Sequence, residues 1–391
     1  MYFQTLDDKT ECVGIYADGT LYFKDFPSDL TKTWRYTGSV KDPAVEYAWL
    51  WSNGFTLAEV CPDFLKERLE SSQRRFRAYL KSFEIGRIRL REHCFFDLVP
   101  EDFLLEFCDV KNEITKFVFE NYEKPDNYAH LHDIQQLLHK IKFQNVNMNI
   151  EGCRKLYQST LGRRKANEIL KRGHYIDYNL FGSITGRLTT NRGSLPILTM
   201  KREFRQLLKP HNDWFISLDY NGAEVRTFLE LSGEEQPQDD IHEWNIKHVL
   251  KEDVDRYTAK QRFFSWLYNP DSDKIKTNFY DKEKLLDKWY VDGYVITPYK
   301  RKMKAERRKA LNYLIQSTTA DRVLERAVVI DKLLKDKKSF ISHIVHDEIV
   351  VDLCDEERDI LPEIKNVFQK DGFLANVNAG RNYLDLERLA I

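Results

Sequence analysis

The sequence predicts an α+β protein with more than one domain. Three observations indicate this class: a strand-like opening, a long helical middle, and a C-terminal half in which strands and helices are mixed. The chain of 391 residues is longer than one typical domain, so two or three packed units are expected. Its 42% hydrophobic content allows each of them a core of its own, as in a soluble globular protein.

The N-terminal elements follow from the spacing of apolar residues. Residues 1 to about 60 alternate apolar and polar side chains around turn signals such as Ala17-Asp18-Gly19-Thr20, which favours strands. Residues 63–120 carry apolar side chains at steps of three and four, which predicts helices. Lys124-Pro125-Asp126-Asn127 marks a break, and a second helical stretch is expected over 128–172.

In the C-terminal half, Trp214-Phe215-Ile216-Ser217-Leu218 predicts a buried strand that leads directly into Asp219. The elements expected after it are a helix over 252–268, one or two long helices over 304–335, and a strand pair over 341–353 with His346-Asp347-Glu348 at its turn.

Composition excludes several classes of protein. No apolar run approaches membrane-spanning length, and the opening MYFQTLDDKTE lacks the features of a signal peptide, so we expect a cytoplasmic protein with no membrane partner. The six cysteines are scattered without CxxC spacing, which argues against a zinc site and a disulfide framework and predicts reduced, mostly buried thiols.

Charge is balanced overall, with 61 Lys and Arg against 62 Asp and Glu, but it is clustered locally. Binding of a phosphate backbone depends on such clusters rather than on net charge. The basic clusters lie at 162–172, 201–205 and 300–309. Each can equally be an ordinary solvated helix face.

Two acids stand where a carboxylate is costly to desolvate. Asp219 closes an apolar strand, and Asp347 lies inside the apolar run HIVHDEIVVD. A divalent cation is the usual compensation for such charges. An isolated acid of this kind is more often an exposed turn residue, but two together favour a metal site.

Two predicted helices carry functional side chains at four-residue spacing, which drifts by only about 40° per step and so lines one helix face. The first helix presents two cations and then two aromatic rings, which suit a triphosphate and a base. In the alternative interpretation, the cations form an ordinary surface stripe and the rings belong to the core. The second presents long polar side chains that can hydrogen-bond a base edge in the minor groove. The two sets are Arg256, Lys260, Phe264 and Tyr268, and Arg308, Asn312 and Gln316.

In order and spacing, these residues resemble the polymerase half of A-family DNA polymerases, the group of bacterial DNA polymerase I and many phage replicative enzymes. The matching segments are Thr185-Gly186-Arg187-Leu188-Thr189-Thr190 for TGRLSS, Asp219-Tyr220-Asn221-Gly222-Ala223-Glu224-Val225-Arg226 for DYSQIELR, Asp240-Ile241-His242 for DIH, the two helical sets above for RxxxKxxx(F/Y)xxxY and RxxxNxxxQ, and His346-Asp347-Glu348 for HDE. Single-subunit RNA polymerases share part of this layout, but Glu224 and the HDE motif resemble the DNA-synthesising branch.

The resemblance implies a catalytic site in which Asp219, Asp347 and the backbone of Tyr220 hold two Mg²⁺ ions, for which Mn²⁺ can substitute. The ions would activate the primer 3′-hydroxyl and stabilise the leaving pyrophosphate. Glu348 would support the acids, and Lys260 would donate a proton to pyrophosphate.

The resemblance also implies the ligand contacts. Glu224 would be the steric gate that excludes the ribose 2′-hydroxyl, so dNTPs are the expected substrates. The residues implied to bind the dNTP are Arg256, Lys260, Phe264, His242, Glu224 and Tyr268. Those implied to contact primer-template DNA are Arg187, Arg308, Asn312, Gln316 and His346.

The implied fold is a right-hand polymerase, preceded by an RNase H-like exonuclease-type α/β domain. The expected domains are an exonuclease-like domain at 1–122, a reduced thumb at 123–184, palm at 185–235 and 301–391, and fingers at 236–300. The short thumb is typical of a compact phage-type member that acts with a processivity factor, a helicase or a separate editing subunit. Asn221-Gly222 replaces the Ser-Gln of the family motif, and Asn191 to Leu198 departs from the usual segment after TGRLSS.

Proofreading in this family needs four metal-binding acids in the N-terminal domain. On the expected alignment these positions hold Gln4, Leu6, Arg77 and Lys111, which cannot bind two Mg²⁺ ions, so the nuclease is predicted to be inactive. In another register, acids that we otherwise take for surface residues could restore a site; they are Asp7, Asp97 and Asp109. Two further functions stay open: a non-catalytic DNA-binding replication subunit, and an active 3′–5′ exonuclease with a relic polymerase domain.

Overall fold

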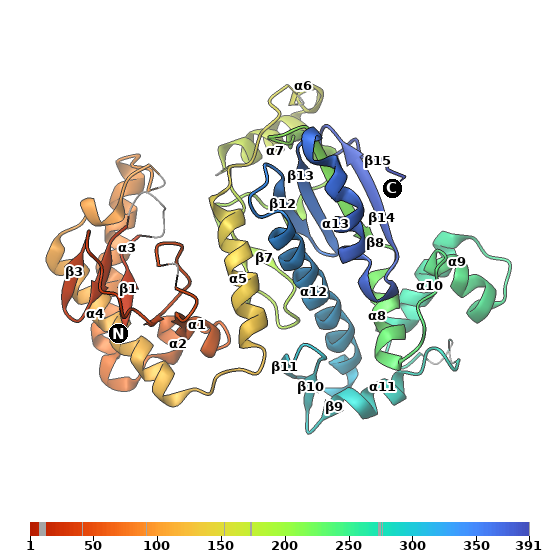
Figure 1. Ribbon diagram of the computed structural model, residues 1–391, viewed down its shortest axis with the longest axis horizontal. Coiled ribbons are helices and arrows are strands. Elements are labelled where there is room, and N and C mark those ends of the chain that lie inside the picture. Colours follow the sequence, from red (N-terminus) through yellow and green to blue (C-terminus); the bar gives the residue numbers. More distant parts are fainter. Residues whose placement is uncertain are drawn as a thin grey trace. The chain divides into compact units, whose positions relative to one another are not determined.

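The computed structural model describes residues 1–7, 13–40, 42–90, 92–151, 153–172, 174–272, 275 and 277–390. The chain divides into two compact units, Met1–His139 and Lys140–Ile391 (Figure 1). The division falls within helix α5 (Tyr128–Phe143), shortly after the domain boundary expected at residue 122.

The first unit combines short strands with two long helices. Strands β1, β2 and β3 form an antiparallel sheet, β4 and β5 pair in parallel, and a parallel bridge between Tyr2 and Lys32 brings the start of β1 beside β4. Helix α4 packs against α3, β1 and β2. The elements are β1 (Phe3–Thr5), β2 (Ile15–Ala17), β3 (Thr20–Tyr22), β4 (Lys32–Thr33), β5 (Glu46–Tyr47), α1 (Ala48–Trp51), α2 (Leu57–Val60), α3 (Lys66–Ile85) and α4 (Glu101–Asn121).

The second unit is built around one antiparallel sheet. Its helices are α6 (Cys153–Leu156), α7 (Thr160–Lys171), α8 (Ala223–Ser232), α9 (Ile241–Asn245), α10 (Arg256–Tyr268), α11 (Lys282–Trp289), α12 (Arg307–Leu333) and α13 (Leu361–Phe368). Its strands are β6 (Tyr178–Asn179), β7 (Thr189–Thr190), β8 (Trp214–Tyr220), β9 (Tyr290–Val291), β10 (Tyr294–Ile296), β11 (Lys302–Lys304), β12 (Phe340–Val345), β13 (Glu348–Leu353), β14 (Ala375–Gly380) and β15 (Glu387–Arg388).

The central sheet has the strand order β12-β13-β8-β14-β15. Strand β8 is buried over most of its length because both its edges are paired and α12 and α13 pack against the sheet (Figure 1). Its apolar sequence therefore suits a central strand. The register places Asp219 directly opposite Glu348 on β13 and Asn376 on β14.

A second apolar core joins α8, α9, α10 and α11 to the first turns of α12. Its largest buried side chains include Phe228, Phe263, Trp266 and Tyr280. Helix α10 is capped by Asp255, the residue before its first turn, whose carboxylate accepts hydrogen bonds from the amides of Tyr257 and Thr258. This core holds α10 at a fixed place relative to α8 and hence to the end of β8.

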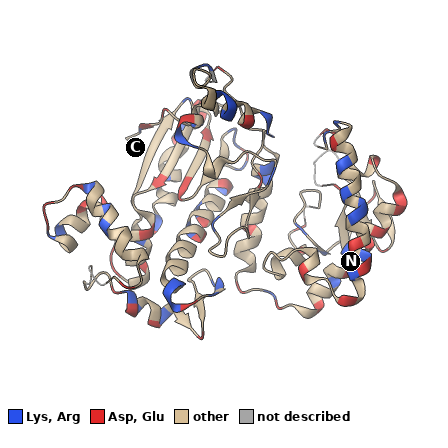
Figure 2. Cartoon of the chain, turned by 180° about the vertical axis from the view of Figure 1, so that it is seen from behind, with Lys and Arg blue, Asp and Glu red and all other residues tan. Residues whose placement is uncertain are grey.

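Most expected elements are confirmed, since β8, α10, α12 and the β12–β13 pair occupy the ranges given by the sequence pattern. The helical stretch expected over 128–172 is wrong in its middle, where α5 ends at Phe143 and an isolated bridge joins Met148 to Leu208. Helix α7 follows; the positions of its Lys and Arg residues are blue in Figure 2, and Arg163, Arg164, Lys165 and Lys171 are exposed. Among the described residues, no helix is both long and apolar enough to span a membrane.

The cysteines follow the expectation only in part. Cys61, Cys108 and Cys354 are buried free thiols, as expected. Cys94, in contrast, is disulfide-bonded. Spacing in the sequence gave no sign of this bond, because disulfide formation depends on which cysteines the fold brings together.

Candidate polymerase active site

Three acids meet where β8 and β13 run side by side. Asp219 lies near the end of β8, Glu348 is the first residue of β13, and Asp347 lies in the two-residue turn between β12 and β13. An open pocket of about 410 Å³ lies over them, and its wall also includes the basic residues Arg202 and Arg205. The turn therefore brings together carboxylates that lie far apart in the sequence.

The charges of these acids are poorly compensated. The pKa of Asp219 is raised to about 7, first because the carboxyl is partly buried and then because Asp347 and Glu348 carry like charges. The ammonium of Lys260, on α10, acts in the opposite direction and so lies close enough to affect Asp219. The site thus favours any cation that enters the pocket.

Glu348 is held by two hydroxyl groups. Ser217 Oγ donates a hydrogen bond of 2.6 Å to Glu348 Oε1, and Tyr383 OH donates one of 2.6 Å to Oε2. With both carboxylate oxygens engaged, Glu348 is suited to shape the pocket rather than to ligate an ion. Ser217 could have been found from the sequence, since it lies two residues before Asp219 on the same face of β8. Tyr383 lies in a loop after β14 and gave no such signal.

The donor set fits magnesium. No group of three or more His, Cys, Asp or Glu side chains within the described ranges is arranged to hold a metal ion. Mg²⁺ does not need one, because it is usually bound by one or two carboxylates together with water and substrate phosphates. Asp219 and Asp347 supply the two carboxylates, and the repulsion that raises the pKa of Asp219 is what a divalent ion would relieve.

Helix α10 presents one mixed face away from its core. Ala259, Phe263, Trp266 and Leu267 are buried. The residues of the other face are Arg256, Lys260, Phe264 and Tyr268, each exposed or half-buried as the four-residue spacing predicted. The rings of Phe264 and Tyr268 lie nearly parallel, with centroids 5.9 Å apart, and aromatic rings of this kind are suited to stack on a base.

Glu224, in the first turn of α8, joins two other predicted residues. One carboxylate oxygen accepts a hydrogen bond from Arg187 and the other accepts one from Tyr268 OH. Gln316 of α12 lies close enough to Tyr268 to act on the pKa of its hydroxyl, which it lowers. The structure therefore brings together Arg187, Glu224, Tyr268 and Gln316, which come from four separate motifs.

Comparisons with known proteins agree with this geometry. No protein-family model matches the sequence. In a match 277 positions long, which covers 56% of this chain and 29% of the other protein, the sequence is 23% identical to DNA polymerase I of Chloroflexus aurantiacus. The structure resembles the POL domain of Pol1 from M. smegmatis, solved with DNA primer-template and dNTP; the TM-score is 0.58 at 15% identity, covering 87% of this chain and 81% of that one.

The chain has the fold of an A-family DNA polymerase. The right-hand class expected from the sequence is confirmed by this likeness. The division into palm and fingers stays a prediction, and its names are kept for the sheet around β8 (palm) and for α9 to α11 (fingers).

Other predicted residues form ion pairs elsewhere or are buried. Arg256 pairs with Asp240, with Nη2 2.7 Å from Oδ2. His242 is only 1% exposed, and burial lowers its pKa to about 4, so its ring is neutral. Arg308 forms an exposed ion pair of 3.0 Å with Asp271. The roles assigned to these side chains stay predictions.

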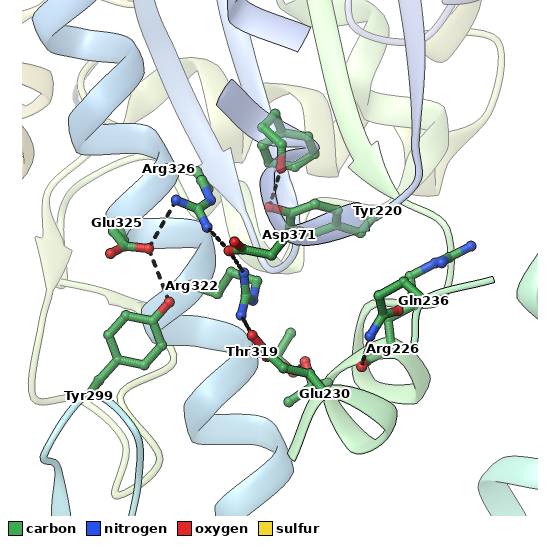
Figure 3. Close-up of polar contacts among 12 residues, drawn as sticks. Tyr220, Arg226, Glu230, Gln236, Tyr299, Thr319, Arg322, Glu325, Arg326 and Asp371 are labelled. Atoms are coloured by element: carbon green, nitrogen blue, oxygen red, sulfur yellow. Dashed lines mark hydrogen bonds and ion pairs between the residues drawn. The ribbon is translucent and has the colours of Figure 1, made fainter. Parts of the chain in front are cut away.

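The sequence gave no indication of a set of buried arginines behind the palm sheet. Arg322 and Arg326 of α12, each 4% exposed at the side chain, both pair with Asp371, and Arg322 also pairs with Glu230 of α8 (Figure 3). The hydroxyl of Tyr220 lies close enough to both guanidinium groups to be affected by their charge, and it donates to the Phe368 carbonyl at 2.7 Å. These contacts anchor the residue that follows Asp219.

Proposed function

We propose that the chain is a template-directed DNA polymerase that adds dNTPs to a primer 3′ end by two-metal nucleotidyl transfer. The proposal rests chiefly on one observation: Asp219 and Asp347 share an open pocket in which the pKa of Asp219 is raised, while the ammonium of Lys260 on α10 acts to lower that pKa. A cluster of repelling carboxylates opposite a cation is suited to bind divalent ions and a triphosphate together.

Bound magnesium would activate the primer hydroxyl and stabilise charge on the departing pyrophosphate. Asp219 and Asp347 would hold it, while Glu348, fixed by its two hydroxyl partners, would keep the turn in place. Lys260 would bind the phosphates and supply a proton to the leaving group. Phe264 would stack on the incoming nucleotide.

Substrate choice would depend on Glu224. Its carboxylate is tied to Tyr268 and Arg187, so it cannot swing aside without breaking both contacts. A rigid carboxylate at this position would crowd a ribose 2′-hydroxyl and so favour dNTPs. The ties to Arg187 and Tyr268 support this role.

We also propose that the enzyme lacks proofreading. Gln4 is fully buried and donates hydrogen bonds to Thr115 and Asn112, where a nuclease would need an acid. Asp109, one of the acids that could restore a site, instead pairs with Arg68 at 2.8 Å and accepts a hydrogen bond from Tyr16. These contacts support an inactive nuclease-type domain.

The thumb is proposed to be reduced, as in a compact phage-type enzyme. Between α5 and β6 the described residues form only the helices α6 and α7. The exposed basic residues of α7 are Arg163, Arg164, Lys165 and Lys171, which would contact the duplex backbone. Because so few residues are available to contact the duplex, we expect the enzyme to act with a processivity factor or another replication subunit.

The test is primer extension with a labelled primer on a longer template. We expect extension with Mg²⁺ and dNTPs, and no shortening of the primer when dNTPs are omitted. The double variant Asp219→Asn/Asp347→Asn should abolish extension. A matched control, Asp63→Asn/Asp102→Asn, removes two exposed acids of the first unit and should leave extension unchanged.

Two outcomes would contradict the proposal. DNA binding without extension by the wild-type chain would indicate a non-catalytic subunit. Primer shortening that survives substitution of both palm acids would indicate an active nuclease.

A further inference from the structure

Asn221 connects the palm to the fingers. It comes two residues after Asp219, is 5% exposed, and uses both ends of its side-chain amide. Its Oδ1 accepts a hydrogen bond of 2.8 Å from the amide of Ile241, and its Nδ2 donates one of 2.6 Å to Asp240 Oδ2. The residue that replaces the serine of the family motif therefore holds the first turn of α9.

Asp240 is fixed on its other side as well. Its Oδ1 caps α9 by accepting hydrogen bonds from the amides of His242 and Glu243, at 3.0 and 3.2 Å. Although burial alone would raise its pKa, hydrogen bonds from Arg256 and Asn221 hold that pKa well below the usual range. The carboxylate is thus ionised and rigidly placed.

The backbone around these two residues is fixed by Arg226. This side chain is fully buried and donates to the carbonyls of Asn221, Pro237 and Asp239 at 2.8 to 2.9 Å. Gln236 in turn donates to the Arg226 carbonyl at 3.0 Å (Figure 3). Two separate stretches of backbone, one after β8 and one before α9, are thereby held together.

Gly222 allows this close approach. Its φ is +66°, and a Cβ added there would lie 2.5 Å from Ile241 Cγ2. A larger residue at this position would push α9 away from the palm. The Asn221-Gly222 pair is therefore matched to the tight contact between the two stretches.

Arg256 is the exposed member of the set. Its Nε and Nη2 donate to Asp240 Oδ2 at 3.0 and 2.7 Å, while its side chain remains 49% exposed. A guanidinium carries five N–H donors in a rigid fork, so these two bonds fix its plane and leave Nη1 to contact another anion. Lys260, one turn further along the same face of α10, acts on Asp219.

Given the proposed function, we infer that Asn221 and Asp240 are positioning residues, which orient Arg256 so that its free N–H groups bind the triphosphate of the incoming nucleotide. Asp240 sets the plane of the guanidinium, and Asn221 sets the position of Asp240. The contact thereby couples the place of the triphosphate to the strand that carries Asp219.

The test measures nucleotide binding without chemistry. A primer-template with a dideoxy-terminated primer is bound to the full chain, and the affinity for the next correct dNTP is determined by fluorescence titration. Asp240→Asn keeps the helix cap but turns an amide donor toward Arg256 or Asn221. We expect this variant to weaken dNTP binding roughly 10-fold and to raise KM for dNTP more than it lowers kcat.

Two further variants separate positioning from simple loss of structure. Asn221→Ala should weaken dNTP binding in the same direction, and Asn221→Ser serves in its place if that variant does not fold. The matched control is Glu252→Gln, which breaks the exposed ion pair with Arg262 of α10. This variant should change neither the affinity for dNTP nor the KM for dNTP. Affinity for primer-template should be unchanged in every variant, whereas a general weakening of the fold would lower it together with dNTP affinity.

The outcomes are distinct. Tighter dNTP binding by Asp240→Asn would mean that Asp240 withholds Arg256 from the nucleotide, and would overturn the inference. Unchanged binding would also overturn it, provided that the wild-type chain binds and extends. Failure of the wild-type chain itself to bind nucleotide would refute the proposed function.

Discussion

The buried ion pair between Arg301 and Asp321 offers a sharp test of how this palm is stabilised. Arg301 precedes β11 and donates to Asp321 of α12 through Nε at 2.9 Å and Nη2 at 2.6 Å. The two side chains are 9% and 0% exposed. Asp321→Asn would leave the guanidinium buried without its counter-charge.

Breaking such a buried pair from one side costs about 3–5 kcal/mol, because the remaining charge has lost both water and partner. For a unit of this size, each kcal/mol lowers Tm by about 2–4 °C, so we expect a fall of roughly 6–20 °C. Thermal and urea unfolding of the wild type and Asp321→Asn measure the loss directly.

Two further proteins complete the experiment. Glu252→Gln breaks an exposed pair with Arg262 and should cost no more than about 1 kcal/mol. The double variant Arg301→Met/Asp321→Leu replaces the pair by apolar side chains and should recover most of the loss. The reasoning is refuted if Asp321→Asn is no less stable than Glu252→Gln, or if the double variant is as unstable as the single one.

Three other predictions concern the active site. Tyr383→Phe removes one of the two hydroxyl groups that hold Glu348, so kcat for primer extension should fall by roughly 3- to 30-fold with little change in Tm. An unaltered kcat would show that this hydrogen bond has no part in the reaction. Because the pKa of Asp219 is raised to about 7 in the folded protein, the folded protein binds more protons than the unfolded chain between about pH 4 and 7. The free energy of unfolding of the metal-free wild type should therefore fall by about 1 kcal/mol per pH unit as pH rises across this window, whereas that of Asp219→Asn should not. Equal slopes for the two proteins in urea unfolding would contradict a raised pKa of Asp219. Glu224→Ala should raise ribonucleotide incorporation relative to dNTP by at least about 10-fold in competition assays, since the carboxylate that Tyr268 holds is removed; a constant ratio would exclude a gate at this position.

Much of the C-terminal half could be predicted from the sequence because its motifs are local. The strand that ends in Asp219 and the helix face that carries Lys260 follow from periodicities of two and near four, which depend only on backbone geometry. The β12–β13 pair was predicted for the same reason, since an apolar run interrupted by one acidic turn has few other structures to adopt.

Partners supplied by distant segments could not be predicted. Nothing in the spacing indicated that Tyr383 would hold Glu348, or that Asp371 would bind two arginines of α12. The pairing of Arg256 with Asp240 was equally hidden, although both residues lay within recognised motifs. The partner of a side chain depends on which distant segments the fold brings together, and on which hydrogen-bond donors remain there after the backbone groups have paired.

The sequence by itself determined the order of the strands and helices, the positions of Asp219 and Asp347 at a strand end and a turn, and the exposed face of α10, because each is encoded within a few consecutive turns or strand residues. Only the tertiary structure decided which groups surround those side chains. It raised the pKa of Asp219 by crowding two further acids beside it, and it lowered the pKa of Asp240 by placing Arg256 and Asn221 against it. Electrostatic environment depends on distance and burial in three dimensions, and neither is written in the spacing of residues along the chain.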